Sequence, residues 1–200
     1  MHPNSAFRQD DRALHIDLIE QVGFGMVFLT TPDGPRAAHT PLLMTSSSTA
    51  RFHLARGNAL TRHLEGATAL ALVNGPDAYV SPRWYADPAQ VPTWNYVALE
   101  LEGLVRQVDR QGLHAMLEAL SARQEARIVQ GTAWTMDKMP PVRLAQMMDS
   151  IVGFELEIKA WRPTFKLSQN KAAEERTRAI AGLEAEGSLA MATLMRTFAK

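Results

Sequence analysis

The chain has 200 residues, of which 46% are hydrophobic and 21% charged, a composition typical of a globular domain rather than a disordered segment. Lysine and arginine together number 21, and so do aspartate and glutamate, so the chain lacks the basic excess typical of nucleic-acid-binding proteins. With no cysteine, disulfides, thiolate catalysis and cysteine-ligated metals are excluded, and a cytoplasmic location is expected. No apolar run resembles a signal peptide or a membrane span, so we expect no membrane association.

The first part of the chain predicts one helix followed by antiparallel strands. Asp10 and Asp11 can cap a helix whose apolar side chains share one face, and Gly23 can end it. Alternating or continuous apolar runs separated by turn residues then predict strands. The expected elements are a helix over 12–22, strands over 25–30, 36–45, 50–55 and 67–73, a helical turn at 60–64, and turns at 31–35, 46–49 and 74–76.

The second part adds two long strands and several helices. A period of two residues predicts strands over 93–108 and 152–166, with Gly103 as a possible bulge. An apolar stripe opposite charged residues predicts a helix over 110–129, a shorter helix follows at 142–148, and two helices split near Gly187 end the chain. Five or six strands in meander order with helices outside predict a small antiparallel barrel in a single domain, 1–200, with C-terminal helices from about residue 172.

The stretch from residue 75 to residue 99 has the most unusual composition. It holds two of the four tryptophans, all three tyrosines and four of the eleven prolines. Prolines stiffen the backbone, so aromatic faces and the polar groups of Ser81, Thr93 and Asn95 are held in place. This arrangement suits a flat heteroaromatic ligand. The alternative is an aromatic loop that plugs one end of the barrel, because aromatic side chains more often pack than bind.

Two polar clusters interrupt the apolar strands. The first, HLARGN (53–58), offers a guanidinium beside a glycine, which suits a phosphate; alternatively the arginine closes a turn. The second, FKLSQNK (165–171), offers an ammonium group, a hydroxyl and two amides, which suit an anionic or carbonyl-rich ligand. Alternatively, Ser168 or Asn170 caps the following helix.

Neither a metal site nor a catalytic residue can be assigned from the sequence. The histidines His39, His53, His63 and His114 have no spacing that places two on one face of an element. No HExxH, paired-carboxylate, Walker or GxGxxG motif occurs. A Ser-His-Asp site stays open, although the chain has no GxSxG nucleophile elbow.

Three motifs together resemble the PaiB-type family, whose members are described as FMN-binding negative transcriptional regulators. They are HLARGN, the block GPDAYVSPRWY…VPTWNY, and FKLSQNK. The beginning of the chain and the segment IVGFELEI are also similar to the family, so the resemblance extends to about Gly187. One departure is Gly57, where the family's HLARAN pattern has alanine; we expect a slightly looser turn and retained binding.

The resemblance implies a fold, an assembly and a cofactor. PaiB-type proteins resemble split-barrel flavoproteins such as pyridoxamine-phosphate oxidases. This implies a mainly β, Greek-key antiparallel barrel with peripheral helices, a homodimer, and FMN in a groove between subunits. The residues that the resemblance assigns to FMN are His53, Ala55, Arg56, Asn58, Ser81, Trp84, Tyr85, Thr93, Trp94, Asn95, Lys166, Ser168, Gln169 and Asn170.

Three functions remain open at this stage. They are a flavin-dependent negative transcriptional regulator, an FMN-dependent oxidoreductase of the pyridoxamine-phosphate-oxidase-like class, and a flavin-binding protein that acts through another protein. DNA is a possible partner through the regulator role, but the balanced charge does not support strong contact with phosphates. Within the site we expect Arg56 to hold the FMN phosphate, and Lys166 to face either the phosphate or the ring edge.

Overall fold

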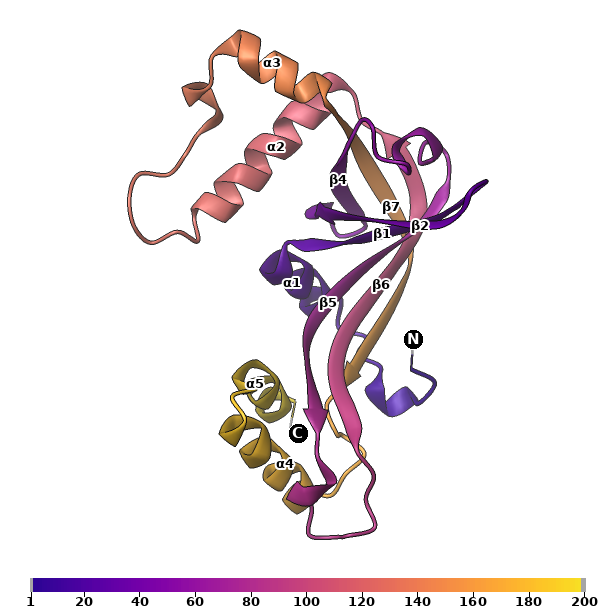
Figure 1. The fold of residues 1–200 in the computed structure, drawn as a ribbon, viewed down its shortest axis with the longest axis vertical. Coiled ribbons are helices and arrows are strands. Elements are labelled where there is room, and N and C mark those ends of the chain that lie inside the picture. The colour runs from indigo at the N-terminus through magenta and orange to yellow at the C-terminus, as the bar shows by residue number, and fades with distance from the viewer. Residues whose placement is uncertain (1, 199–200) are drawn as a thin grey trace. The chain divides into compact units, whose positions relative to one another are not determined.

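Seven strands form one antiparallel sheet in the computed structural model, which describes residues 2–198 (Figure 1). The strand order is β2-β1-β5-β6-β7-β4-β3. The strands are β1 (Phe24–Thr31), β2 (Gly34–Pro41), β3 (Leu43–Ser46), β4 (Thr49–Ala55), β5 (Thr68–Val80), β6 (Thr93–Gln107) and β7 (Ile151–Lys166).

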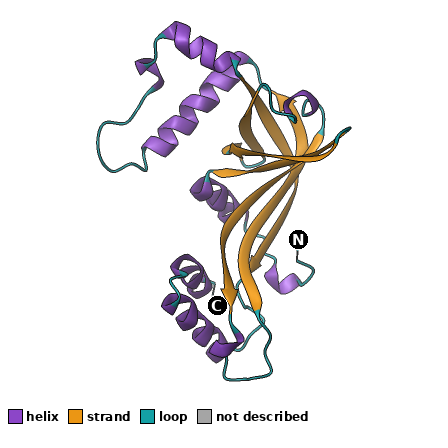
Figure 2. Ribbon diagram, in the orientation of Figure 1, coloured by secondary structure: helices purple, strands orange, loops and turns teal. Residues whose placement is uncertain are grey.

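Five α-helices accompany the strands in the described residues (Figure 2). They are α1 (Arg12–Val22), α2 (Arg110–Glu125), α3 (Pro141–Asp149), α4 (Ala173–Ala185) and α5 (Leu189–Thr197). Short 3₁₀ helices lie at Ser5–Phe7, Thr61–His63, Pro82–Trp84 and Met136–Lys138. In the part of the chain that the structure describes, no helix is both long enough and apolar enough to cross a membrane.

The chain divides into two compact units. The first unit holds the N-terminal residues up to Asp11, the segment Asn74–Leu99, and the chain from Arg162 onward. The second unit holds Arg12–Val73 and Glu100–Trp161. The strands β5, β6 and β7 each contribute residues to both units.

The second unit is built on paired strands with apolar faces. β4 pairs antiparallel with β7, and the register sets Phe52 opposite Phe154. Both rings are fully buried and stack with their centroids 5.5 Å apart, so this cross-strand pair stabilises the sheet.

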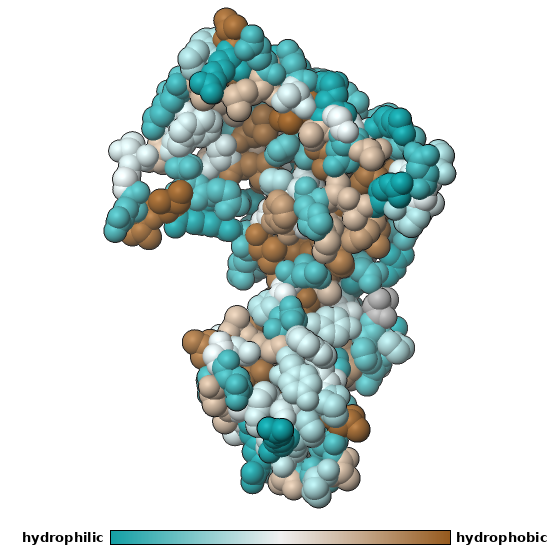
Figure 3. Space-filling view, viewed as in Figure 1, coloured by the Kyte–Doolittle hydropathy of each residue, from teal (hydrophilic) through white to brown (hydrophobic). Residues whose placement is uncertain are grey.

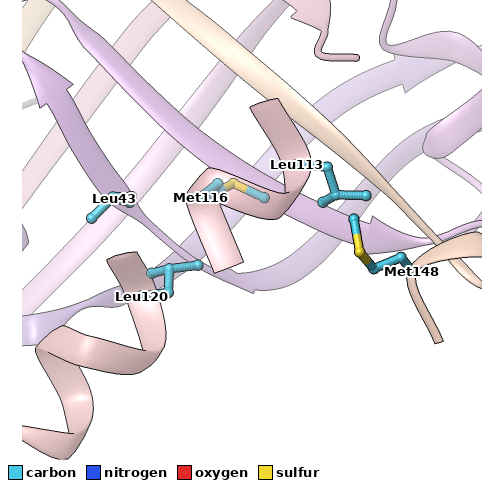
Figure 4. Close-up of a cluster of buried hydrophobic side chains, with 5 residues drawn as sticks. All are labelled: Leu43, Leu113, Met116, Leu120 and Met148. Carbon is cyan, nitrogen blue, oxygen red and sulfur yellow. The ribbon is translucent and has the colours of Figure 1, made fainter. Parts of the chain in front are cut away.

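Helix α2 packs its apolar stripe against this unit (Figure 4). Leu113, Met116 and Leu120 follow one another at helical spacing and contact Leu43 of β3 and Met148 of α3. The Asp109 side chain caps the helix by accepting a hydrogen bond of 2.7 Å from the Gly112 amide.

The first unit carries the helix pair α4 and α5. Leu183 of α4 and Met195 of α5 are fully buried. Gly187, between the helices, has a φ of 79°, a conformation that glycine adopts without strain. The expected split near Gly187 is therefore confirmed.

Several expected boundaries are confirmed, and others are wrong. The helix over 12–22 is as predicted, whereas the helix over 110–129 ends at Glu125. The strand predicted over 36–45 is broken at Leu42, between β2 and β3. The Leu42 side chain is buried, and its backbone N–H donates a hydrogen bond to the Gly23 carbonyl (3.1 Å), which interrupts the strand after Pro41.

The predicted turn at 74–76 and the predicted meander order are also wrong. Residues 74–76 continue β5, because the extended backbone before a proline is compatible with a strand. The meander is corrected to an order in which β1 lies beside β5 and β4 beside β7. This order agrees with the Greek-key barrel implied by the family resemblance, so the expected fold class is confirmed.

Gly103 allows two strand backbones to approach closely. A Cβ atom at this position of β6 would lie 2.1 Å from the Glu157 carbonyl oxygen in β7. Any larger residue would force the two strands apart. The bulge that we expected here stays a prediction.

Candidate functional site

In the second unit, the predicted site residues lie at the end of β4 and in the turn that follows. Arg56 donates from Nε to the Asp149 carbonyl (2.7 Å) and from Nη2 to the Ile151 carbonyl (3.2 Å). Its amide donates to the Ser150 carbonyl (2.8 Å). The guanidinium therefore ties the end of β4 to the junction between α3 and β7, which is the turn-closing role that the sequence left as an alternative.

The other residues of this group also serve the local structure. The Asn58 side chain accepts a hydrogen bond from the Leu60 amide (2.9 Å), and the Ala55 carbonyl accepts one from the Thr61 hydroxyl (2.9 Å). His53 differs, because its Nδ1 atom is buried without a hydrogen-bond partner among the described residues. Burial lowers the pKa of His53, so its imidazole is held in the neutral form.

Ligand space beside Arg56 is small. A cavity of about 190 Å³ is lined by Arg56, Arg110 and Asp149 together with residues of α2 and β7. Arg110 and Asp149 form an ion pair with each other. This volume is below the range of about 300–1,000 Å³ that is usual for sites that enclose a ligand.

In the first unit, Asn95 of β6 and Ser168 form a buried pair. They are 0% and 4% exposed, and the Asn95 amide donates to the Ser168 hydroxyl (2.9 Å). The same amide contacts the Met195 sulfur of α5 at 3.3 Å. Ser168 adopts a φ of 61°, a conformation that is uncommon for residues other than glycine. The pair therefore locks the chain after β7 to β6 and α5.

The other polar side chains of the two motifs are bonded to neighbouring strands or to their own segment. Lys166 donates to the Thr93 hydroxyl, and burial lowers the pKa of its ammonium group. Gln169 accepts from the Leu167 amide (2.7 Å) and donates to the Phe165 carbonyl. These contacts stiffen the end of β7, whereas Asn170 is exposed.

Trp94 lies on the opposite face of β6 from Thr93 and Asn95, because side chains alternate along a strand. It is 54% exposed, and Tyr79 of β5 beside it is 46% exposed. Their rings meet edge to face with centroids 6.1 Å apart. Tyr79 is missing from the residues assigned from sequence, although the period-two pattern of β5 could have placed it with Trp94.

A pocket of about 480 Å³ is formed next to this aromatic pair. Its lining residues are Tyr79, Ser81, Arg83, Trp84, Glu186 and Ser188. Ser81 caps the short helix Pro82–Trp84 by accepting from the Arg83 amide (3.3 Å). Trp84 rests on α4, where a Cβ atom on Gly182 would lie 2.2 Å from the indole. The pocket thus unites Ser81 and Trp84 with three polar side chains that the sequence assignment missed.

The electrostatics of this pocket combine one cation and one anion. The Arg83 guanidinium has no partner among the residues that the structure describes, and Glu186 lies on the same pocket wall. Arg83 lies within the motif segment SPRWY, so the sequence motif could have indicated it as a pocket residue. Glu186 comes from the chain after α4, which no motif marked. Nearby, burial raises the pKa of Tyr85, whose ring lies 5.3 Å from the Lys171 ammonium.

Comparisons with known proteins agree on one family. A family profile described as "Putative FMN-binding domain" matches residues 1–160. The chain is 30% identical over 159 residues to "Protease synthase and sporulation protein PAI 2" of Bacillus subtilis (strain 168), covering 78% of this chain and 75% of that protein.

Solved structures show the same fold at low sequence identity. The FAD and heme binding protein from Mycobacterium smegmatis superposes with a TM-score of 0.61 at 19% identity, covering 86% of this chain and 78% of that chain. The conserved hypothetical protein Rv2991 from Mycobacterium tuberculosis has a TM-score of 0.59 at 14% identity, covering 85% and 92%. These likenesses support the split-barrel fold.

Proposed function

Because the chain belongs to the PaiB-type family of FMN-binding domains, FMN is its cofactor, and we propose that it acts as an FMN-dependent negative regulator of transcription. We further propose that residues 1–200 work as one flavin-binding domain. The support is the family match together with 30% identity to a relative named for protease synthase and sporulation. The single observation that carries the flavin part of the proposal is the pocket beside Trp84.

The residues of this pocket fit the chemical groups of FMN. A flat ring system needs aromatic or apolar walls, which Tyr79 and Trp84 provide. The phosphate and the ring carbonyls need donors, which the unpaired Arg83 guanidinium and two hydroxyls provide. The ring N3–H needs an acceptor, for which Glu186 is available. The volume of about 480 Å³ lies within the usual range for ligand sites.

The same tests do not favour Arg56 as the phosphate ligand. Its cavity of about 190 Å³ is small, and its guanidinium already donates to two backbone carbonyls. We therefore propose that FMN occupies the pocket beside Trp84 and that Arg83 holds its anionic part. Arg56 as the phosphate ligand is the alternative, and the two assignments predict different effects of Arg56→Ala.

Titration with two flavins tests this site, because riboflavin lacks the phosphate. Fluorescence quenching of FMN and riboflavin is measured with the wild type, Arg83→Ala and Arg56→Ala. Loss of a charge-assisted contact in Arg83→Ala should weaken FMN binding by about 2–4 kcal/mol and leave riboflavin binding almost unchanged. Arg56→Ala should change both affinities to the same degree. If instead Arg56→Ala weakens only FMN, the phosphate belongs to Arg56 and our assignment is overturned.

A second experiment tests the regulator role against oxidoreductase activity. The family and its resemblance to pyridoxamine-phosphate oxidases support the oxidoreductase as the second candidate. Repeated anaerobic bleaching of the bound flavin by NADH or NADPH, followed by turnover with an acceptor, would favour the enzyme. Regulation predicts that transcript levels change when the gene is deleted and return with the wild type but not with Arg83→Ala.

Direct contact of a regulator with DNA can be measured separately. The zero net charge predicts weak binding to random duplex DNA even at low salt. A sub-micromolar and steeply salt-dependent affinity for random duplex would contradict this expectation. With weak binding confirmed, the regulator must act through base-specific contacts or through another protein.

A further inference from the structure

A second pocket, distinct in its residues from the proposed flavin site, lies in the second unit along α2. We call it the α2 pocket; its volume is about 420 Å³. One wall is a single helix face, because residues 118, 121, 122 and 125 follow one another at spacings of three, one and three residues. The other wall is the segment Ala133–Asp137 of the connection between α2 and α3.

Hydrogen bonds position the wall formed by the connection between α2 and α3. The Trp134 amide donates to the Glu125 carboxylate (2.8 Å), and the Lys138 ammonium donates to the Ala133 carbonyl (2.8 Å). Met136 is buried at the same wall. The connection is therefore attached to α2 rather than extended into solvent.

The charge of the lining is negative. Glu118, Glu125 and Asp137 line the pocket, and no lysine, arginine or histidine does. A hydrogen bond from the Thr135 hydroxyl lowers the pKa of Asp137, so this carboxylate is ionised at neutral pH. Glu118 has no partner within residues 2–198, so its charge is available to a ligand.

The spacing of the carboxylates and the apolar surface of the α2 pocket favour an organic cation over a metal ion. Among the described residues, no group of three or more acidic or histidine side chains is placed to hold a metal ion. Glu118 and Glu125 are separated by about 10 Å along the helix axis. Three alanines, Met136 and Trp134 add apolar surface to the same pocket. An indole beside carboxylates attracts organic cations through the ring face and through charge.

From these observations we propose that the α2 pocket binds an organic ammonium ion with an apolar, ring-sized body. The apolar body contacts Trp134 and Met136, and the ammonium group contacts Glu118 or Glu125. This site is independent of the proposed flavin function, because none of its residues lines the pocket beside Trp84.

Calorimetric titration of the FMN-loaded protein tests the proposal with 2-phenylethylammonium and 2-phenylethanol, which have nearly the same shape and differ in charge. The ammonium ion should bind about tenfold more tightly than the alcohol. This comparison needs only the wild type, so it does not depend on the folding of a variant. Equal affinities, or no binding of the amine at millimolar concentration, would overturn the proposal.

Variants then locate the binding site. In the double variant Glu118→Gln/Glu125→Gln, the charges are removed but the acceptor for the Trp134 amide is kept. This double variant should bind the ammonium ion about tenfold more weakly and bind the alcohol with unchanged affinity. Glu174→Gln, an exposed carboxylate on α4, is the matched control and should have no effect. Unchanged binding of the ammonium ion in the double variant would place the cation elsewhere and refute the assignment.

Discussion

Asn95 of β6 and Ser168, which follows β7, form a buried hydrogen-bonded pair. Both side chains are buried, and each satisfies the other. Asn95→Ala should therefore lower the free energy of unfolding by about 2 kcal/mol, because it leaves the Ser168 hydroxyl unpaired and opens a cavity. Urea unfolding of the flavin-free protein measures this loss. Asn170→Ala, an exposed amide in the same motif, should be nearly neutral, and equal losses in both variants would contradict the structural role.

His53 makes stability depend on pH. Burial lowers its pKa, so the unfolded chain binds more protons than the folded chain once the pH falls below about 6.5, the pKa of a free histidine. The contribution of His53 is thus present at neutral pH and is lost as the pH falls through 6.5 towards the folded-state pKa. His53→Gln should show a smaller drop in the free energy of unfolding between pH 7.5 and 5.5 than the wild type. The exposed His39→Gln should keep the full drop.

Among the structural elements, replacing glycine by alanine should have opposite effects on stability at two positions, Gly182 and Gly57. Gly182→Ala would place a methyl group 2.2 Å from the Trp84 indole, so the ring must move off α4. We expect a loss of stability, a changed near-ultraviolet circular dichroism signal and weaker FMN binding.

In Gly57→Ala, the new methyl group meets no atom within 4 Å, and the substitution restores the residue expected for the family. It should raise stability by about 0.5 kcal/mol through lower entropy of the unfolded chain. Identical behaviour of the two variants would contradict the packing of Trp84.

The elements also show which features the sequence can predict. The helix over 12–22 follows from local signals, since its apolar spacing and Gly23, with a φ of 66°, determine its extent. The break at Leu42 is not local, because it depends on the bond from the Leu42 amide to the Gly23 carbonyl. The order of the strands likewise depends on long-range pairing that periodicity does not reveal.

Only part of the pocket beside Trp84 could be predicted from the sequence. The motifs identified Ser81 and Trp84, because a stiff aromatic segment is visible in the sequence. Glu186 and Ser188 follow α4 and reach the pocket only through tertiary packing, so no local pattern marks them. Strand alternation, by contrast, is visible in the sequence and places the side chains of Trp94 and Asn95 on opposite faces of β6.

In the molecule as a whole, several large apolar side chains are exposed, and their exposure favours contact with another protein chain. Figure 3 shows apolar side chains on the visible surface around α2, and α3 exposes Val142 and Met147. In the first unit, Tyr79 and Trp94 form an exposed aromatic pair. Aromatic side chains are enriched at interfaces between protein chains, so their exposure favours association.

We therefore expect a homodimer in which Trp94 is part of the contact between subunits. Light scattering at micromolar concentration should give twice the mass of the chain. Trp94→Lys should shift the mass towards the monomer, because a charge replaces an aromatic anchor at a desolvated surface. Val129→Lys is the control, since Val129 is 97% exposed in a loop and its change should leave the dimer intact. A monomeric wild type would refute the dimer. A dimer that survives Trp94→Lys but not Val129→Lys would move the contact to the connection between α2 and α3.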